Sequence, residues 1–156
     1  QTTTKVEKEE TPTKPKTVSK TLRLYFHDPM SDKKIYLSKN VNITDNAIVT
    51  AIINEFKNPP NSSYVAINPS AGVSSAKVNK ESNLLTVDFN NSILTKTFGS
   101  GIEGYFLQGL VNTLGYNLGV SNVRITINGK GYSSGHFDLG SCDYFSVNYN
   151  GWNPTN

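Results

Sequence analysis

Apolar and polar residues alternate with a period of two in the first patterned part of the chain. Leu22, Leu24 and Phe26 are separated by polar or amphipathic residues, which predicts a strand with one buried face. Turn-forming residues fill positions 28–32, and the alternation then resumes over residues 34–38. The pattern therefore predicts a second short strand or the second arm of a β-hairpin.

Residues 46–57 instead follow a helical period, with apolar side chains gathered in one broad stripe. Thr44 or Asp45 can cap the start of this helix, and Pro59-Pro60 ends it. Several of the apolar residues are β-branched, which lowers the intrinsic helix propensity. We therefore expect this helix to depend on packing against a sheet.

A second, longer helix is predicted over residues 100–118. Ser100 and Glu103 have the spacing of a capping box at its start, and Gly119 is placed for a left-handed C-terminal stop. Glycines inside a helix each cost about 0.5 to 1 kcal/mol relative to alanine. Close approach to a neighbouring backbone would explain the three in this helix, and a groove for a partner is the alternative; they are Gly104, Gly109 and Gly115.

Three further strands complete the pattern. Residues 73–78 and 84–89 read as a hairpin, and residues 123–127 read as a last core strand that leads into a turn at Asn128-Gly129. The order strand, strand, helix, strand, strand, helix, strand predicts an α+β fold. We expect two helices packed on one face of a small mixed β-sheet, with an extra N-terminal strand or hairpin.

Composition divides the chain into three parts. Residues 1–20 contain only two aliphatic side chains and read as a disordered linker, because burial cannot offset the entropy cost of ordering them. Residues 21–140 form the expected domain. Residues 141–156 are an aromatic and Asn-rich extension, which we expect to add an edge strand and to end in an exposed tail.

The charge excludes one class of function. The formal net charge is +3, and residues 1–20 hold five Lys against three Glu, which is +2 and leaves +1 for the rest of the chain. A nucleic-acid-binding face needs many clustered Lys and Arg to neutralise phosphates, so we expect no nucleic-acid partner. No stretch approaches the roughly 18 apolar residues of a membrane span. We therefore expect no membrane span in this chain; the resemblance described below implies membrane contact only through an N-terminal anchor absent from this chain.

The titratable residues offer little for catalysis. His136 and Asp138 stand two positions apart and could share a face, but no nucleophile or Glu accompanies them in the sequence. His27 and Asp28 are adjacent, so on a strand they point to opposite faces. Cys142 is the chain's single cysteine, and neither histidine is close to it in sequence.

Two other patterns have structural explanations. Gly129-Lys130-Gly131 follows a strand and lacks the spacing of a phosphate-binding loop, so we interpret it as a hairpin turn. Asp28, Asp32 and Asp45 lie in or beside turns, where a solvated capping role is common. We expect no enzyme, and no catalytic, cofactor-binding or metal site.

An ordered series of motifs covers about residues 20–140. It comprises Val87-Asp88-Phe89, Val111-Asn112-Thr113-Leu114, Gly119-Val120, a Val/Ile strand at 123–127 and Asn128-Gly129. This series resembles the GerMN domain of bacterial sporulation and germination lipoproteins. In the helical motif, Asn112 and Thr113 would satisfy helix-end groups while Val and Leu fill the core.

The resemblance implies a fold and a function. GerMN domains are similar to ring-building motifs, in which two helices pack on a three-stranded sheet. Family members are lipoproteins held by the N-terminus outside the cytoplasmic membrane, and in endospore formers they act in the channel between mother cell and forespore. The best-known sporulation member carries two such domains, whereas this chain has room for one.

Two functions follow as hypotheses. The first is a non-catalytic assembly module outside the cytoplasm, whose partners would be other envelope or sporulation proteins or a second copy of the chain. The alternative is a module that binds cell-wall glycan (peptidoglycan), because exposed aromatic rings can stack on sugars. The aromatic residues that motivate it are Tyr64, Tyr132, Tyr144, Tyr149 and Trp152.

Overall fold

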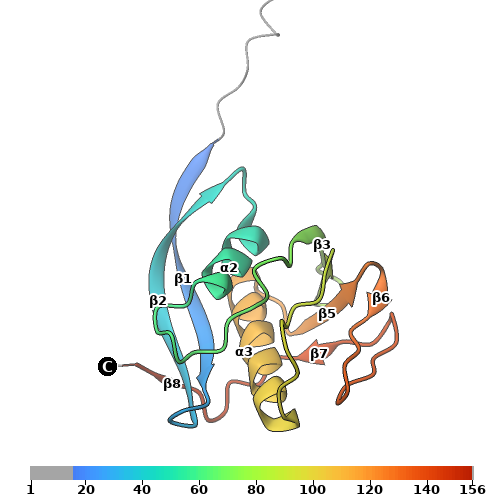
Figure 1. Cartoon of the computed structure of the whole chain (residues 1–156). Coiled ribbons are helices and arrows are strands. Elements are labelled where there is room, and N and C mark those ends of the chain that lie inside the picture. Colours follow the sequence, from blue (N-terminus) through green and yellow to red (C-terminus); the bar gives the residue numbers. More distant parts are fainter. Residues whose placement is uncertain (1–15, 156) are drawn as a thin grey trace, which may run out of the picture.

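A long antiparallel hairpin begins the part of the chain that the computed structural model describes, residues 16–155. Strand β1 (Thr17–Asp28) pairs with β2 (Lys33–Thr44) along its whole length, from Thr17 opposite Thr44 to Asp28 opposite Lys33. The alternation in the sequence thus correctly predicts a hairpin here. Its open end projects beyond the rest of the domain (Figure 1).

The first strand starts earlier than expected. The predicted linker extends to residue 20, but residues 17–20 belong to β1, and residues 1–15 lie outside the described part of the chain. The side chains of residues 17–21 are exposed, so burial does not hold this end. Backbone pairing with β2 orders it instead, and such pairing leaves no hydrophobic signal in the sequence.

A second sheet is mixed, as predicted. Its strand order is β3 (Val73–Asn79), β4 (Leu84–Phe89), β5 (Asn122–Ile127) and β6 (Lys130–Gly131), and β7 (Phe145–Ser146) also pairs with β5. Strands β4 and β5 are parallel, while the other pairs are antiparallel. Parallel neighbours need a crossover connection, and the long helix between β4 and β5 supplies it.

Two helices, α2 (Ile48–Lys57) and α3 (Ser100–Leu118), lie between the hairpin and the mixed sheet (Figure 1). Apolar side chains from both sheets and both helices form one continuous core. In β4 the alternate residues Leu85, Val87 and Phe89 are all fully buried, as the period of two predicts. The predicted α+β class is therefore confirmed.

The expected side-chain caps at the starts of the helices are absent. Helix α2 begins after Ala47, without a side-chain cap, and the Asp45 carboxylate accepts a hydrogen bond from the backbone N–H of Lys16 instead. Helix α3 begins after Gly99, also without a side-chain cap. The predicted C-terminal stop is confirmed, since Gly119 has a φ of 71° and its N–H donates to the Gly115 carbonyl.

Strand β1 is buried on more than the one face that its alternation predicts. Tyr25 and His27, on the face opposite Leu24, are only 2% and 3% exposed. The C-terminal segment and α3 cover this face. The Tyr25 ring lies 5.5 Å from that of Tyr149 and 5.8 Å from that of Trp152, and the His27 ring lies 4.8 Å from that of Tyr105. Because Tyr and His are found both in solvent and in cores, the sequence pattern did not reveal that this second face is buried.

The C-terminal extension packs against the domain at two places. As expected, it adds to a sheet edge, with β7 on β5 and the two-residue β8 (Asn153–Pro154) parallel to β2. Trp152 is only 6% exposed, whereas residues 153–155 after it are exposed even though β8 pairs with β2. The C-terminal extension is therefore part of the same sheet as the hairpin, through the pairing of β8 with β2.

Two of the three helical glycines lie where the backbone of another segment approaches closely. A Cβ atom on Gly109 would stand 2.7 Å from the Tyr25 carbonyl oxygen, and one on Gly115 would stand 2.8 Å from the Val120 carbonyl oxygen. Both distances are too short for a side chain. Gly104 differs, because the nearest atom to its Cβ would be a Phe137 ring carbon at 3.8 Å, an ordinary contact.

Candidate functional site

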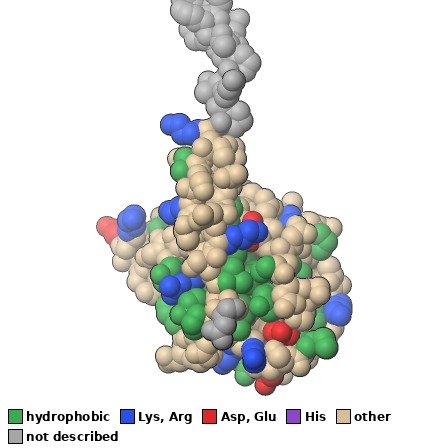
Figure 2. Space-filling model, turned by 90° about the vertical axis from the view of Figure 1, so that its left-hand side faces the viewer, with side chains coloured by type: hydrophobic (Ala, Val, Ile, Leu, Met, Phe, Trp, Pro, Cys, Tyr) green, Lys and Arg blue, Asp and Glu red, His purple; other side chains and the backbone are tan. Residues whose placement is uncertain are grey.

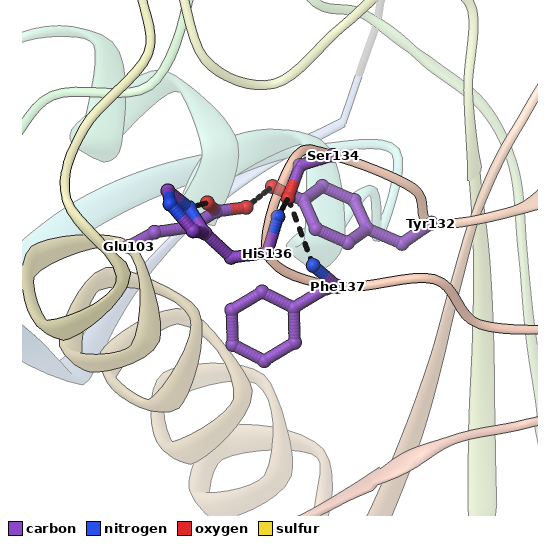
Figure 3. Close-up of polar contacts among 5 residues, drawn as sticks. All are labelled: Glu103, Tyr132, Ser134, His136 and Phe137. Atoms are coloured by element: carbon purple, nitrogen blue, oxygen red, sulfur yellow. Dashed lines mark hydrogen bonds and ion pairs between the residues drawn. The ribbon is translucent and has the colours of Figure 1, made fainter.

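A buried carboxylate near the start of α3 organises a cluster of polar side chains. The Tyr132 hydroxyl lies 2.5 Å from one oxygen of Glu103, and Nδ1 of His136 lies 3.0 Å from the other (Figure 3). Glu103 is 2% exposed and Tyr132 is 3% exposed. We call Glu103, Tyr132, Ser134 and His136 the Glu103 cluster.

The sequence assigned two of these residues differently. Glu103 was expected to complete a capping box with Ser100, but its carboxylate points into the cluster, and only its backbone N–H bonds to the Gly99 carbonyl. The expectation that no Glu accompanies His136 is also wrong, because the folded chain brings Glu103 beside it. These residues are about thirty positions apart, so local spacing could not indicate the contact.

The cluster holds Glu103 as a carboxylate. Burial opposes ionisation, but interactions with Ser134, Tyr132 and His136 outweigh it and place the pKa of Glu103 below its ordinary value of 4.5. The pKa of the Tyr132 hydroxyl is shifted in the opposite direction, because burial and the adjacent Glu103 carboxylate raise it. At neutral pH the cluster is therefore an ionised carboxylate held by donors.

The Ser134 hydroxyl of the Glu103 cluster is bonded within its own loop. The Ser134 hydroxyl oxygen accepts from the backbone N–H of His136 and from that of Phe137, and no hydrogen bond joins it to the imidazole among the described residues (Figure 3). A serine nucleophile is typically activated by a hydrogen bond from its hydroxyl to a base. The hydrogen bonds from Tyr132 and His136 to Glu103 fasten the segment after β6 to the start of α3.

The other residues singled out in the sequence lie apart from the cluster. His27 is buried, its Nε2 is 3.6 Å from an Asp32 oxygen, and burial lowers the pKa of its imidazole. Cys142 is exposed. Within residues 16–155, no group of three or more His, Cys, Asp or Glu side chains is arranged to hold a metal ion.

Asp28 and the Gly-Lys-Gly segment have the structural roles expected for them. Asp28 accepts hydrogen bonds from the N–H groups of Met30 and Ser31 within a turn. Residues 128–129 form the hairpin turn between β5 and β6, with positive φ angles of 51° at Asn128 and 81° at Gly129. The predicted turn is therefore confirmed.

The aspartate of the Val-Asp-Phe motif holds this turn in place. One oxygen of Asp88 accepts hydrogen bonds from the Thr126 hydroxyl at 2.7 Å and from the Gly129 N–H at 2.8 Å. These two bonds lower the pKa of the Asp88 carboxyl. The motif thus links β4, β5 and the turn that follows.

The helical motif joins α3 to two other segments. Asn112 and Thr113 were expected to serve helix ends, but they lie in the middle of α3. The Tyr25 N–H donates to the Thr113 hydroxyl at 2.9 Å. The Asn112 amide bonds to both the N–H and the carbonyl of Asn148, each at 2.8 Å. The motif therefore fixes β1 and the C-terminal segment against the helix.

One turn further along α3, Asn117 completes the edge of β1. Its amide oxygen accepts from the Arg23 N–H at 3.1 Å, and its amide nitrogen donates to the Arg23 carbonyl at 2.7 Å. An amide side chain thereby takes the place of a neighbouring strand. The backbone of Arg23 is consequently held on both sides, by β2 and by α3.

The side chain of Arg23 lies between two tyrosine rings on the outer face of this assembly. Its Cζ is 4.5 Å from the centre of the Tyr36 ring and 4.3 Å from that of Tyr116. Tyr149 lies beside Tyr116, with ring centres 6.3 Å apart. We call Arg23, Tyr36, Tyr116 and Tyr149 the tyrosine-arginine surface. Figure 2 faces this side and shows hydrophobic side chains gathered with basic ones among them.

The five aromatic residues that motivated glycan binding do not form one exposed surface. Tyr132 and Trp152 are buried, and Tyr64 stacks on the core residue Phe26 with ring centres 5.3 Å apart. Tyr144 and Tyr149 are exposed, at 52% and 39%. Sequence reasoning missed Arg23, Tyr36 and Tyr116 because the surface draws on β1, β2, α3 and the C-terminal segment, which share no local motif.

Comparison with solved structures identifies the class of domain. The fold is similar to the tandem GerMN domains of the sporulation protein GerM from Bacillus subtilis, with a TM-score of 0.58 and 23% identity, over 83% of this chain and 46% of that structure. It is also similar to the first GerMN domain of the same protein, with a TM-score of 0.50 and 17% identity, over 72% of this chain and 86% of that one. The fold is that of a GerMN domain.

The family model named Germane, for sporulation and spore germination, matches residues 23–133. The chain therefore belongs to this sporulation and germination family. It spans about half the length of the tandem-domain structure that it matches. A search of curated proteins found no match. Within residues 16–155, no helix is long and apolar enough to cross a membrane.

Proposed function

We propose that this GerMN domain is a non-catalytic interaction module of a sporulation or germination assembly, and that it acts outside the cytoplasmic membrane as part of a lipoprotein. Its partners would be other envelope proteins or further copies of the chain. The family match supports the process. The interaction role is supported by the tyrosine-arginine surface.

The composition of that surface carries the proposal. Tyr, Trp and Arg are enriched among the residues that contribute most to protein interfaces. Tyr116 and Tyr149 are 47% and 39% exposed, and their rings meet at 6.3 Å beside the Arg23 side chain. The Glu103 cluster contrasts with it, because its carboxylate is already bound by groups of the same chain.

The test is photo-crosslinking in the source organism during sporulation and germination. A photoreactive amino acid would replace exposed residues on several faces, among them Met30, Val78, Tyr116 and Tyr144. We expect covalent adducts with protein from at least one position. Light scattering on the purified domain would run in parallel to detect self-association. A monomer in solution, with no protein adduct at any position in cells that express the chain, would refute the proposal.

A second measurement addresses location. A protease added to intact cells or forespores should degrade the domain while leaving a cytoplasmic marker intact. Protection of the domain equal to that of the marker would contradict the extracytoplasmic assignment. Peptidoglycan sedimentation tests the glycan hypothesis, and retention above that of an unrelated domain would support it.

A further inference from the structure

The guanidinium group of Arg23 has no acidic partner within the described part of the chain. The ion pairs there join His27 with Asp32, Lys39 with Glu55, and His136 with Glu103, and none includes Arg23. Its Nε is buried without a hydrogen-bond partner. Arginine remains charged at all working pH values. Among residues 16–155, this cation between two tyrosine rings therefore has no counter-charge.

The surroundings hold this cation in position before any partner arrives. The Arg23 backbone is fixed by β2 on one side and by Asn117 on the other. The rings of Tyr36 and Tyr116 limit the movement of the guanidinium. Tyr25, buried beneath, packs against Tyr36 with ring centres 5.2 Å apart. A group ordered in advance loses less entropy on binding, which favours affinity.

Covering this site with a purely apolar partner would be unfavourable. Removing a charge from water costs several kcal/mol unless an opposite charge and hydrogen bonds compensate. A carboxylate is the matching group, because the planar guanidinium can donate two parallel hydrogen bonds to it. The exposed rings of Tyr116 and Tyr149 would cover apolar neighbours of that carboxylate.

We propose that the tyrosine-arginine surface binds an acidic side chain of a protein partner, with an Asp or Glu carboxylate against Arg23 and an apolar residue over Tyr116 and Tyr149. This inference rests on the proposed interaction function and specifies the chemistry of the partner. The partner's acidic residue supplies the counter-charge that the described chain lacks.

The ring geometry favours a protein segment over a glycan. Sugar rings stack on flat aromatic faces, and a chain of sugars needs adjacent rings that form a platform. The Tyr116 and Tyr149 rings are nearly perpendicular, at 87°. Perpendicular rings instead form the walls of a corner, which suits a compact side chain.

The first experiment locates the contact. A photoreactive residue at Tyr116 and another at Tyr149 would be crosslinked in the full-length protein during sporulation, and the adducts mapped by mass spectrometry. We expect a partner peptide that contains Asp or Glu next to an apolar residue. Adducts with peptidoglycan, or with protein segments that lack an acidic residue, would overturn the proposal.

The second experiment tests the charge pairing with purified components. Arg23→Gln should weaken binding of the mapped partner at least about tenfold, because it removes the charge. Arg23→Lys should weaken binding less, since it keeps the charge but loses the planar fork. Lys77→Glu, on the exposed edge strand β3, is the matched control and should leave affinity within about twofold.

A charge exchange gives the decisive outcome. Arg23→Glu should abolish binding, and changing the mapped acidic residue of the partner to Arg should restore it. Thermal melting of each variant distinguishes lost binding from lost folding. If binding of Arg23→Gln equals that of the native chain, or if exchange restores nothing while both variants are folded, the pairing is wrong. Crosslinks found only on other faces would refute this surface while leaving the interaction function intact.

Discussion

Tyrosine meets charge in two regions of this domain, with opposite results. In the Glu103 cluster, Tyr132 donates to a buried carboxylate that His136 also contacts, so the charge is compensated inside the chain. On the tyrosine-arginine surface, Tyr36 and Tyr116 flank a cation that no described carboxylate contacts. The first arrangement joins parts of the fold, and we propose that the second binds a partner.

This difference suggests a way to distinguish residues that maintain the fold from residues that are candidates for binding. The criterion is whether a charged group is compensated within the described chain. A satisfied buried polar group is costly to disturb, because its partners remain buried without it. On the tyrosine-arginine surface, Tyr116 is 47% exposed and can be changed at little cost to the fold. Stability measurements should therefore separate the two regions.

Loss of the Glu103 carboxylate should produce the largest change. Glu103→Ala leaves the buried Tyr132 hydroxyl without its acceptor, and we expect a loss of about 2 to 4 kcal/mol in the free energy of unfolding. Glu55→Ala is the control: it removes a surface ion pair with Lys39 and should cost about 0 to 1 kcal/mol. Urea unfolding measures both, and equal losses would contradict the internal role of the cluster.

A side chain at Gly109 should have the next largest effect, because this glycine lies beneath the tyrosine-arginine surface. Gly109→Ala places a Cβ against the Tyr25 carbonyl and the Trp152 ring, and we expect it to cost about 1 to 3 kcal/mol. Gly101→Ala meets no atom within 4 Å and should be neutral or stabilise by at most about 1 kcal/mol. Thermal melting of the two variants measures the effect. Melting temperatures equal to that of the native chain for both variants would disprove the close contact at Gly109.

Acid should weaken the contribution of Glu103. Its pKa is lower in the folded chain than its ordinary value of 4.5, so the folded state favours the ionised form. This stabilisation is complete above about pH 4.5 and is lost as the pH falls through the folded-state pKa. The difference in unfolding free energy between the native chain and Glu103→Gln should therefore shrink on acidification. A difference that stays constant from pH 7 to pH 3 would argue against the ionised carboxylate.

Removal of the Tyr116 ring should change stability least. The residue is 47% exposed, and we expect Tyr116→Ala to cost no more than about 1 kcal/mol in urea unfolding. The same variant should lose most of its binding to the crosslinked partner. A large loss of stability instead would move Tyr116 from the interaction surface to the set of residues that maintain the fold.

The sequence was sufficient for the elements and most of the core. The alternation in β4 and the helical periods of α2 and α3 report one-sided burial directly, and those elements form where expected. The pattern could not show that the C-terminal segment covers the second face of β1. Tyr25 and His27 can lie in solvent or in a core, so their positions in an alternating strand were ambiguous.

The candidate sites were beyond local reasoning for a different reason. Ser100 and Glu103 satisfy the spacing of a capping box, yet the same Glu can also reach a loop about thirty residues away, and the tertiary contact prevails. Arg23, Tyr36, Tyr116 and Tyr149 come from four segments and meet only after folding. Spacing rules describe neighbours on one element, whereas both sites depend on contacts between elements.

The exposed open end of the hairpin has a mechanical consequence. Residues 17–21 are held to β2 by backbone pairs and by exposed hydrogen bonds of the Thr17 and Thr21 hydroxyls, whereas Leu22 is fully buried. A pull on the chain from the N-terminal side would part these pairs one after another and then stop at the core. The five residues would release roughly 16 Å of extended chain. Residues 17–21 would therefore extend under tension before the core of the domain unfolds.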